Sequence, residues 1–312
     1  MDHVAVGIDV SKDKLDVCLL PQGELFVVSR NAAGLSSLNE RLKTLPVGII
    51  AIEATGGFET VVAASLASAG FPVAVVNPAQ VRHFAQALGK RAKTDPIDAF
   101  VIARFAEATR PAVRPLDDEA TRLLSALLAR RRQIIEMIVA ETHREKAVTD
   151  KTLKKSIAQL ETALKRALGD IDARIDERMR SSPAWKAKED LLSSVPGVGT
   201  MTARTLIADM PELGRLSPKE IAALAGLAPY TQQSGKWKGK TFTTGGRATV
   251  RSALYLAAMV AARHNPVLKA FRERLRAAGK LPKVAIIAVA RKLLTILNAM
   301  VRENQSWQPK NT

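Results

Sequence analysis

The hydrophobic pattern of this chain changes its period once, near residue 115, and that change constrains the fold more than any other feature. Before it, short apolar runs rich in Val, Ile and Leu alternate with amphipathic segments of helical spacing. Strands are predicted within 4–20 (two, joined by a tight turn at the polar stretch 11–14) and at 25–28, 48–53 and 72–76, and helices at 34–44 and 58–69. Strands that alternate with helices predict an α/β sheet domain over roughly residues 1–110.

After residue 115 the pattern is helical almost throughout. One narrow apolar seam repeats every three or four positions, at Leu153, Ile157, Leu160, Leu164, Leu168, Ile171 and Ile175. Such a seam is typical of a coiled coil or helical hairpin, within one chain or between two, and equally of a helix packed on its own domain. Ser181-Ser182-Pro183 predicts a break in the helix. We expect an α/β domain at 1–112, a helical coiled-coil linker at 113–182, an all-α domain at 183–305 and a tail at 306–312.

The charge is distributed unevenly between these parts. The 312 residues carry a net charge of +17. Residues 1–100 hold nine Lys and Arg against ten Asp and Glu, which is −1, so the rest of the chain carries +18. Residues 231–300 hold fourteen basic residues and a single acid, Glu273. An excess of this size predicts a polyanionic partner, bound through the C-terminal part.

The single cysteine, Cys18, excludes an internal disulfide and a cysteine-rich zinc site, and its apolar surroundings indicate a core residue. We find neither an apolar signal segment nor an uninterrupted apolar stretch of membrane-spanning length. The sequence therefore predicts a cytoplasmic protein with access to nucleic acid and no membrane contact.

Four carboxylates stand at positions that favour a shared site. Asp9 and Glu53 each end a predicted strand, and Asp95 and Asp98 begin a predicted helix. Ligands of open α/β sheets bind beyond the carboxyl ends of strands, and residues three apart share a helix face. Four clustered carboxylates need a counter-charge, and a pair of Mg²⁺ ions would supply it. Two metal ions also suit the cleavage of phosphodiester bonds.

Each acid also has a plainer interpretation. Asp95 before Pro96, with Asp98 in the first turn, suits a helix N-cap. Asp9 alone would suit a turn at the end of a strand, and Glu53 alone an exposed surface acid. The combination of all four in one basic chain favours the metal site.

Two motifs in the basic part indicate phosphate contacts. Val195-Pro-Gly-Val-Gly199 precedes a helix and resembles a helix-hairpin-helix, in which Gly197 and Gly199 would bring backbone N–H groups against a phosphate. A tight turn without a ligand is the alternative. Downstream, Ser234-Gly235 lies among basic residues: Lys236, Lys238, Lys240, Arg247 and Arg251. On chemistry alone this is a basic turn.

The fragments GIDVSKDKLDV, IEATGGFE, VVNPAQVRHFAQALGKRAKTDPIDAFVIARF and SVPGVGTMTARTLIADM resemble the DEDD-type insertion-sequence transposases of the insertion-sequence one-ten family. The resemblance runs in order from about residue 4 to 300. It implies a RuvC-like (RNase H-like) N-terminal domain with Asp9, Glu53, Asp95 and Asp98 as its acids, and it places the positive residue ahead of the last pair at Lys93. It also implies Ser234 as a covalent nucleophile, a non-coding bridge RNA, and a tetramer on synapsed DNA.

The function expected on these grounds is a site-specific DNA recombinase that cuts and rejoins donor and target DNA. Three alternatives stay open at this point. A RuvC-like two-metal endonuclease or junction resolvase would use Ser234 only structurally. An actin-like sugar kinase shares the turn after the first strand but would need glycine-rich nucleotide loops that this chain lacks. A non-catalytic nucleic-acid-binding protein leaves the four acids unexplained.

Overall fold

The structure is a computed structural model that describes residues 3–89, 95–113, 118–231, 233–234, 237–239 and 241–308. For Asp95, Pro96, Trp237 and Lys238 it describes the backbone alone. The chain forms two compact units, Met1–Leu116 and Asp117–Thr312.

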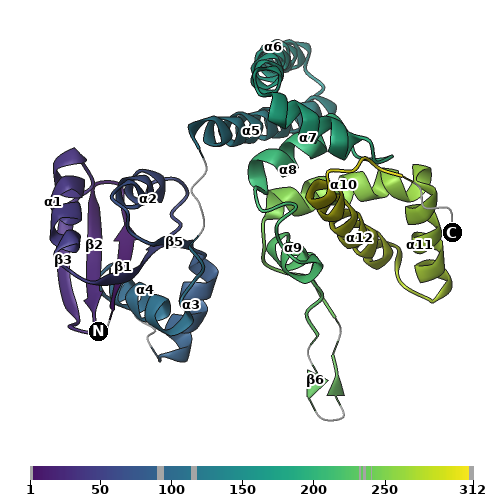
Figure 1. The fold of residues 1–312 in the computed structure, drawn as a ribbon. Helices are drawn as coiled ribbons and strands as arrows, with labels where there is room; N and C mark the ends of the chain where they lie inside the picture. The colour runs from purple at the N-terminus through teal and green to yellow at the C-terminus, as the bar shows by residue number, and fades with distance from the viewer. Residues whose placement is uncertain are drawn as a thin grey trace. The chain divides into compact units, whose positions relative to one another are not determined.

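The first unit is a five-stranded mixed sheet with helices on both faces (Figure 1). Its strands lie in the order β3-β2-β1-β4-β5; the first three are antiparallel, and β4 and β5 run parallel to β1. The elements are β1 (Val4–Val10), β2 (Lys14–Leu20), β3 (Glu24–Ser29), α1 (Ala32–Lys43), β4 (Val47–Glu53), α2 (Glu59–Ser68), β5 (Val73–Val76), α3 (Pro78–Ala87) and α4 (Asp95–Thr109). The predicted α/β domain, with its five strands, is confirmed.

Side chains alternate between the two faces of the sheet, and the residues on one face are larger than those on the other. Large residues such as Ile8, Val17 and Ile52 pack under α1 and α2. On the other face, small residues meet α4, at Ala5, Cys18, Ala51 and Ala74 together with Ala99, Ala103 and Ala106 of the helix. Cys18 is buried there, which confirms its predicted place in the core. Burial raises the pKa of its thiol to about 11.

Gly7 lets α4 lie directly on β1. A Cβ atom at this position would stand 2.2 Å from the backbone nitrogen of Ala103 and 2.3 Å from the carbonyl oxygen of Ala99. The helix backbone therefore touches the strand backbone, a distance that only glycine permits. This contact sets the depth and position of α4 against the carboxyl end of β1.

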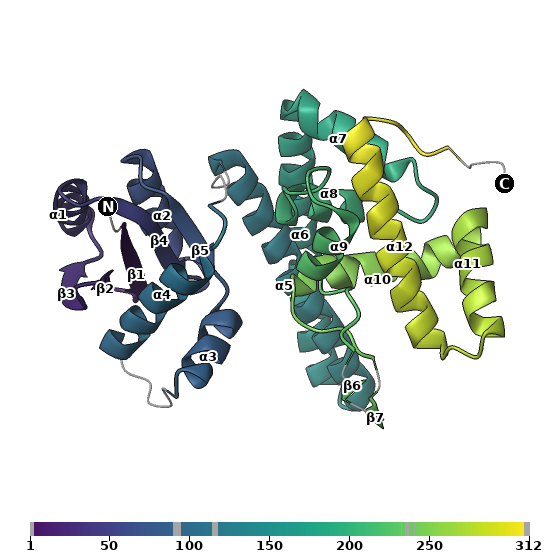
Figure 2. The ribbon, with the colours of Figure 1, turned by 60° about the horizontal axis from the view of Figure 1, so that its bottom comes forward.

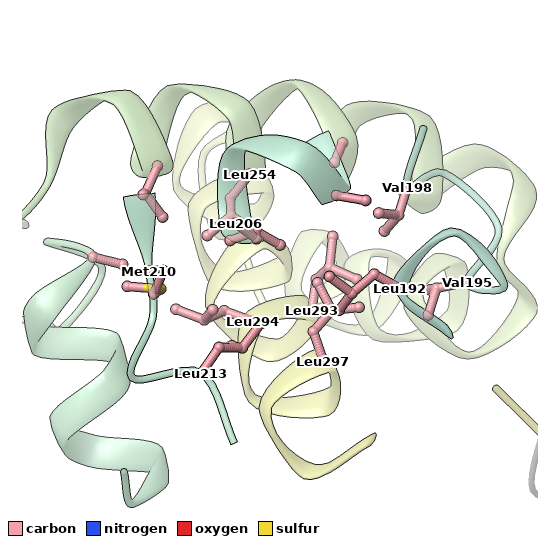
Figure 3. Close-up of a cluster of buried hydrophobic side chains, with 14 of the residues drawn as sticks. Leu192, Val195, Val198, Leu206, Met210, Leu213, Leu254, Leu293, Leu294 and Leu297 are labelled. Carbon is pink, nitrogen blue, oxygen red and sulfur yellow. The ribbon is translucent and has the colours of Figure 1, made fainter. Parts of the chain in front are cut away.

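The second unit is mostly helical. Its helices are α5 (Glu119–Ala147), α6 (Lys151–Ser181), α7 (Pro183–Ser193), α8 (Thr200–Asp209), α9 (Pro218–Leu224), α10 (Ala248–His264), α11 (Pro266–Ala277) and α12 (Pro282–Glu303). Figure 3 shows its core, where Leu192, Leu206, Leu254 and Leu294 come from four different helices. The expectation of an all-α domain was wrong in one respect. Two short strands, β6 (Gln233–Ser234) and β7 (Trp237–Lys238), form a β-hairpin between α9 and α10.

Helices α5 and α6, predicted as a linker, form an intrachain hairpin whose base joins the C-terminal core. Ile175 and Met179 of α6 are buried in that core, whereas Leu153 and Leu160, in the half nearer the loop, are 55% and 47% exposed. Along the hairpin, Arg131 donates to Asp172 at 2.6 Å and Thr142 to Glu161 at 2.9 Å. The break predicted at Ser182 is present, because Ser182 ends α6 and caps α7.

Helix α12 is long and apolar enough, by length and composition, to span a membrane. Within the unit it is a core helix that packs on α7, α9, α10 and α11, and its Leu293, Leu294 and Leu297 are fully buried (Figures 2 and 3). A core helix of a globular unit passes the same test of composition, so the burial of α12 accounts for its hydropathy.

Candidate active site

Asp9 and Glu53 lie beside each other on neighbouring parallel strands. Ile8 of β1 is the register partner of Ile52 of β4, so the next residue of each strand, Asp9 and Glu53, falls at the same level. Both follow, by two positions, a residue that faces α4 (Gly7 and Ala51), and alternation places both acids on that face. The carboxyl ends of two adjacent strands thus present two half-buried carboxylates toward one helix.

Helix α4 carries the third acid to the same face. Ala99, which contacts β1 at Gly7, immediately follows Asp98, and Asp98 is half-buried. The helix begins at Asp95, as predicted, but the side chain of Asp95 and all of Lys93 lie outside the described residues. Among the side chains that the structure describes, no three Asp, Glu, His or Cys residues converge closely enough to hold a metal ion. The set of four acids as a metal site therefore stays a prediction, and the structure describes the positions of Asp9, Glu53 and Asp98.

Asp16 is an acid of this region that sequence reasoning missed. It lies on β2 as the register partner of Asp9 and, like Cys18 two residues later, faces α4. It is only 4% exposed and forms an ion pair with Lys14, whose Nζ lies 3.2 Å from Oδ2. The signal was present in the sequence, because a tight turn at residues 11–14 pairs position 16 with position 9.

The loop after β4 is held by Glu59, which explains the pattern IEATGGFE. One carboxylate oxygen of Glu59 accepts hydrogen bonds from the Thr55 backbone N–H at 3.1 Å, the Thr55 hydroxyl at 3.0 Å and the Gly57 N–H at 2.8 Å. Burial alone would raise the pKa of Glu59, but these donors outweigh it and hold the pKa below its usual value. The ionised Glu59 thus fixes the loop that follows Glu53.

Ser234 lies near the tip of the β6–β7 hairpin, which extends from the helices around α9 (Figure 1). Ser234 is the register partner of Trp237 across the hairpin. At the base, Tyr230 and Phe242 exchange two backbone hydrogen bonds of 2.8 and 3.1 Å, and their rings stack at 6.3 Å. Ser234 is exposed. Lys236 and Lys240, and the side chain of Lys238, fall outside the described residues.

Two of the predicted phosphate-binding arginines hold the loop that leads into α10. Arg247 donates to both carboxylate oxygens of Glu212, at 2.5 and 2.7 Å, and to the carbonyl of Asp209 at 3.1 Å. Arg251 donates to the carbonyl of Gly245. Arg247 is a third exposed, so most of its hydrogen-bonding capacity serves the fold. Their contacts with nucleic acid stay a prediction.

The glycines of the turn between α7 and α8 differ in what surrounds them. Gly197 has a φ of +102°, and a Cβ atom there would stand 2.5 Å from the Cα atom of Ala261 in α10. Gly199 caps α8 with an ordinary φ of −84°, and no described atom lies within 4 Å of its Cβ position. Gly197 therefore has a packing role, whereas the space at Gly199 is free of described atoms and the phosphate contact there stays a prediction.

These surroundings predict different outcomes for two identical substitutions. Gly197→Ala forces a methyl group into the α10 backbone and should lower the free energy of unfolding by about 3 kcal/mol. Gly199→Ala should cost about 1 kcal/mol or less, yet weaken nucleic-acid binding about tenfold by blocking close approach to the backbone N–H groups. Denaturant unfolding and filter binding measure the two effects. Unchanged affinity in Gly199→Ala would contradict a phosphate at this helix end.

Comparison with known proteins identifies the family. Residues 6–154 match the DEDD-type IS110 transposase family, and residues 189–273 match the transposase IS116/IS110/IS902 family. The pilin gene-inverting proteins of Moraxella lacunata and Moraxella bovis are each 30% identical to this chain over 331 aligned positions, which cover 99% of both chains. The insertion element IS900 42 kDa protein of Mycobacterium paratuberculosis is 32% identical over 167 residues, 52% of this chain and 40% of that protein. The chain therefore belongs to the IS110 family of transposases and is a DNA transposase or recombinase.

Proposed function

We propose that this transposase cuts and rejoins donor and target DNA under the guidance of a bridge RNA, with a Mg²⁺-dependent acid site and a covalent serine–DNA intermediate. The observation that carries the proposal is the pairing of Asp9 with Glu53 at the carboxyl ends of β1 and β4, against the helix that bears Asp98. The mixed five-stranded sheet and these acids support a RuvC-like first unit.

The donor set fits a hard divalent cation. Asp9, Glu53, Asp95 and Asp98 offer carboxylate oxygens only, which are the ligands that Mg²⁺ prefers. When bound, Mg²⁺ supplies positive charge that stabilises the phosphate during displacement. The protein's own contribution is to hold Asp9 and Glu53 at one level of the sheet and to fix α4 against them through Gly7.

Ser234 supplies the nucleophile in this proposal. Its Oγ attacks the phosphorus, the bond from phosphorus to the leaving sugar oxygen breaks, and that oxygen takes up a proton while the serine hydroxyl loses one. The serine ester conserves the phosphodiester bond, so a sugar hydroxyl can later reverse the step and rejoin the strands without an energy source. Its exposed position near a hairpin tip gives Ser234 access to a DNA strand.

The proposed RNA and DNA partners are supported by charge and by family membership. The chain beyond residue 100 carries +18, enough for many phosphate contacts with two nucleic acids. Acting on chromosomal and element DNA places the enzyme in the cytoplasm of a prokaryotic cell, at the nucleoid.

Trapping the covalent intermediate tests the proposal. Wild-type protein with labelled DNA and Mg²⁺ should give a protein-linked band on denaturing electrophoresis, and peptide mass mapping should place the label on Ser234. Ser234→Ala should lose the band completely, because the attacking oxygen is gone. Thr231→Ala removes another exposed hydroxyl from the same hairpin arm and should keep the band.

Three results would contradict the serine mechanism. The first is the absence of a band in the wild type, and the second is a label on Tyr230 or Tyr255. The third is strand hydrolysis that survives in Ser234→Ala at the wild-type rate, which is the behaviour of a two-metal endonuclease or resolvase.

We also infer that the enzyme assembles as a dimer that pairs into a tetramer on synapsed DNA. Support comes from Leu153 and Leu160, which leave an apolar strip exposed on the outer half of α6. Replacing both with Glu should shift light scattering from dimer to monomer and leave the circular dichroism spectrum unchanged. The double substitution Lys154→Glu and Lys155→Glu, on the same turns, is the control and should keep the dimer.

A further inference from the structure

The second unit contains a cationic pocket that the proposed function leaves unused. It has a volume of about 370 Å³ and lies between α7, the loop of residues 211–215 and the C-terminal end of α12. We call it the α7–α12 pocket. Its lining is apolar apart from Asn304 and three cationic side chains: Lys188 of α7, Arg215 of the loop and Arg302 of α12. No carboxylate is among its lining residues.

The loop that carries Arg215 is locked onto α12. Gly214 has a φ of +92°, and a Cβ atom there would stand 2.7 Å from Cγ1 of Val301. Asn298, which is 1% exposed, accepts a hydrogen bond from the Gly214 N–H at 2.8 Å and donates to the carbonyl of Leu216 at 2.9 Å. The buried amide of Asn298 thus holds the loop that carries Arg215 against the helix that carries Arg302.

The surrounding acids are already neutralised by other cations. On α7, Glu189 and Asp190 pair with Lys186, and Glu189 also accepts from Arg204 at 2.6 Å. Across the part of the chain that the structure describes, Lys188 and Arg215 have no ion pair with any acid, and Arg302 has only its exposed neighbour Glu303, at 3.3 Å. Two of the three cations of the pocket, Lys188 and Arg215, therefore lack a counter-charge among the described residues.

Lys188 is the group most affected by this imbalance. Burial and the nearby charge of Arg215 both lower the pKa of Lys188. Bringing an anion into the pocket would relieve this repulsion, because each cation would gain an opposite charge at short range.

We propose that the α7–α12 pocket binds a backbone phosphate of the nucleic acid that the enzyme processes, an inference that rests on its proposed action on DNA and RNA. Arg215 and Arg302 are both exposed residues of the pocket lining, so a strand passing over the surface can reach them. A guanidinium matches two phosphate oxygens at once, and Lys188 adds a point charge from within. Such a contact positions the strand without reading its sequence.

The salt dependence of binding tests this site in the full-length protein. The triple variant K188Q/R215Q/R302Q should bind duplex DNA or single-stranded RNA with a shallower dependence of log affinity on log salt. The expected decrease in slope is about 0.9 for each duplex phosphate lost and about 0.7 for each single-strand phosphate. A change on DNA alone or on RNA alone identifies which strand occupies the pocket. If the triple variant fails to fold, Arg215→Gln alone, at an exposed position, is measured in its place.

A control variant with the same loss of charge distinguishes a phosphate contact in the pocket from a general effect of net charge on binding. K154Q/K155Q/R166Q removes three exposed cations from α6. It should reduce the slope of log affinity against log salt by less than the pocket variant does. An unchanged slope in the pocket variant, or an equal loss in both variants, would overturn the assignment. Binding is measured in EDTA, so a failure of the proposed serine and metal chemistry would leave this result intact.

Discussion

Asp9→Asn should reduce DNA cleavage and rejoining by at least about 1,000-fold, which is about 4 kcal/mol of transition-state stabilisation, and leave nucleic-acid affinity within about twofold of wild type. Asp9 lies level with Glu53 on the adjacent strand, so its loss removes a negative charge from the centre of the proposed Mg²⁺ site. Affinity is expected to persist because the positive charge lies beyond residue 100. Single-turnover cleavage of labelled DNA and filter binding measure the two quantities.

Asp13→Asn is the matched control for this substitution. Asp13 is an exposed acid in the turn between β1 and β2, four residues from Asp9, and the chemical change is the same. Its rate should stay within a few-fold of wild type. Wild-type cleavage by Asp9→Asn in Mg²⁺ would show that the acids of the sheet are not the metal site.

Gly7→Ala should have the largest effect on the fold, a loss of about 3 kcal/mol or more in the free energy of unfolding of the first unit. The added methyl group would meet the backbone of α4 at Ala103 N and Ala99 O. No rotamer change can relieve a collision between a side chain and backbone. Because α4 carries Asp98, cleavage should be lost even where the protein stays folded. For the same reason, Ala103→Gly should fail to rescue the variant.

The measurement can be confined to one unit. All three Trp residues, at positions 185, 237 and 307, lie in the second unit, so their fluorescence should be unaffected while far-UV circular dichroism reports the lost structure. Gly23→Ala is the control that distinguishes steric crowding by neighbouring atoms from strain in the backbone of the substituted residue. Gly23 has a φ of +73° with no described atom within 4 Å of its Cβ position, and its substitution should cost only about 1–2 kcal/mol. Equal destabilisation by the two substitutions would contradict the crowding argument.

Local pattern was sufficient for the five strands of the first unit and for two of its acids, but it did not predict helix α3 (Pro78–Ala87). Each strand showed either alternation or an apolar run, and the ends of β1 and β4 pointed directly to Asp9 and Glu53. Asp16 was missed because finding it requires following the register from one strand to the next, and a single strand pattern carries no register.

Contacts between distant segments could not be predicted from sequence spacing. Arg247 looked like a phosphate contact within a basic run, but its partner Glu212 lies 35 residues earlier. Gly197 suited a phosphate-binding turn, but its φ and the proximity of α10 require glycine in any case. The β6–β7 hairpin lies in a Gly- and Lys-rich stretch without an apolar run, so neither strand gave a signal.

The length of the β6–β7 hairpin arms sets both how far Ser234 reaches and which side it faces. Strands advance about 3.4 Å per residue and alternate their side chains, so one residue added to each arm would carry Ser234 outward by that distance and turn it to the opposite side. Two residues added to each arm would restore its facing and extend the reach by about 7 Å. Because the Tyr230–Phe242 clamp closes the base, such changes leave the helical body untouched. Changes in arm length would therefore alter the distance between Ser234 and the helical body without altering the helices. Such changes offer a way to fit the protein to DNA bound at a different distance from that body.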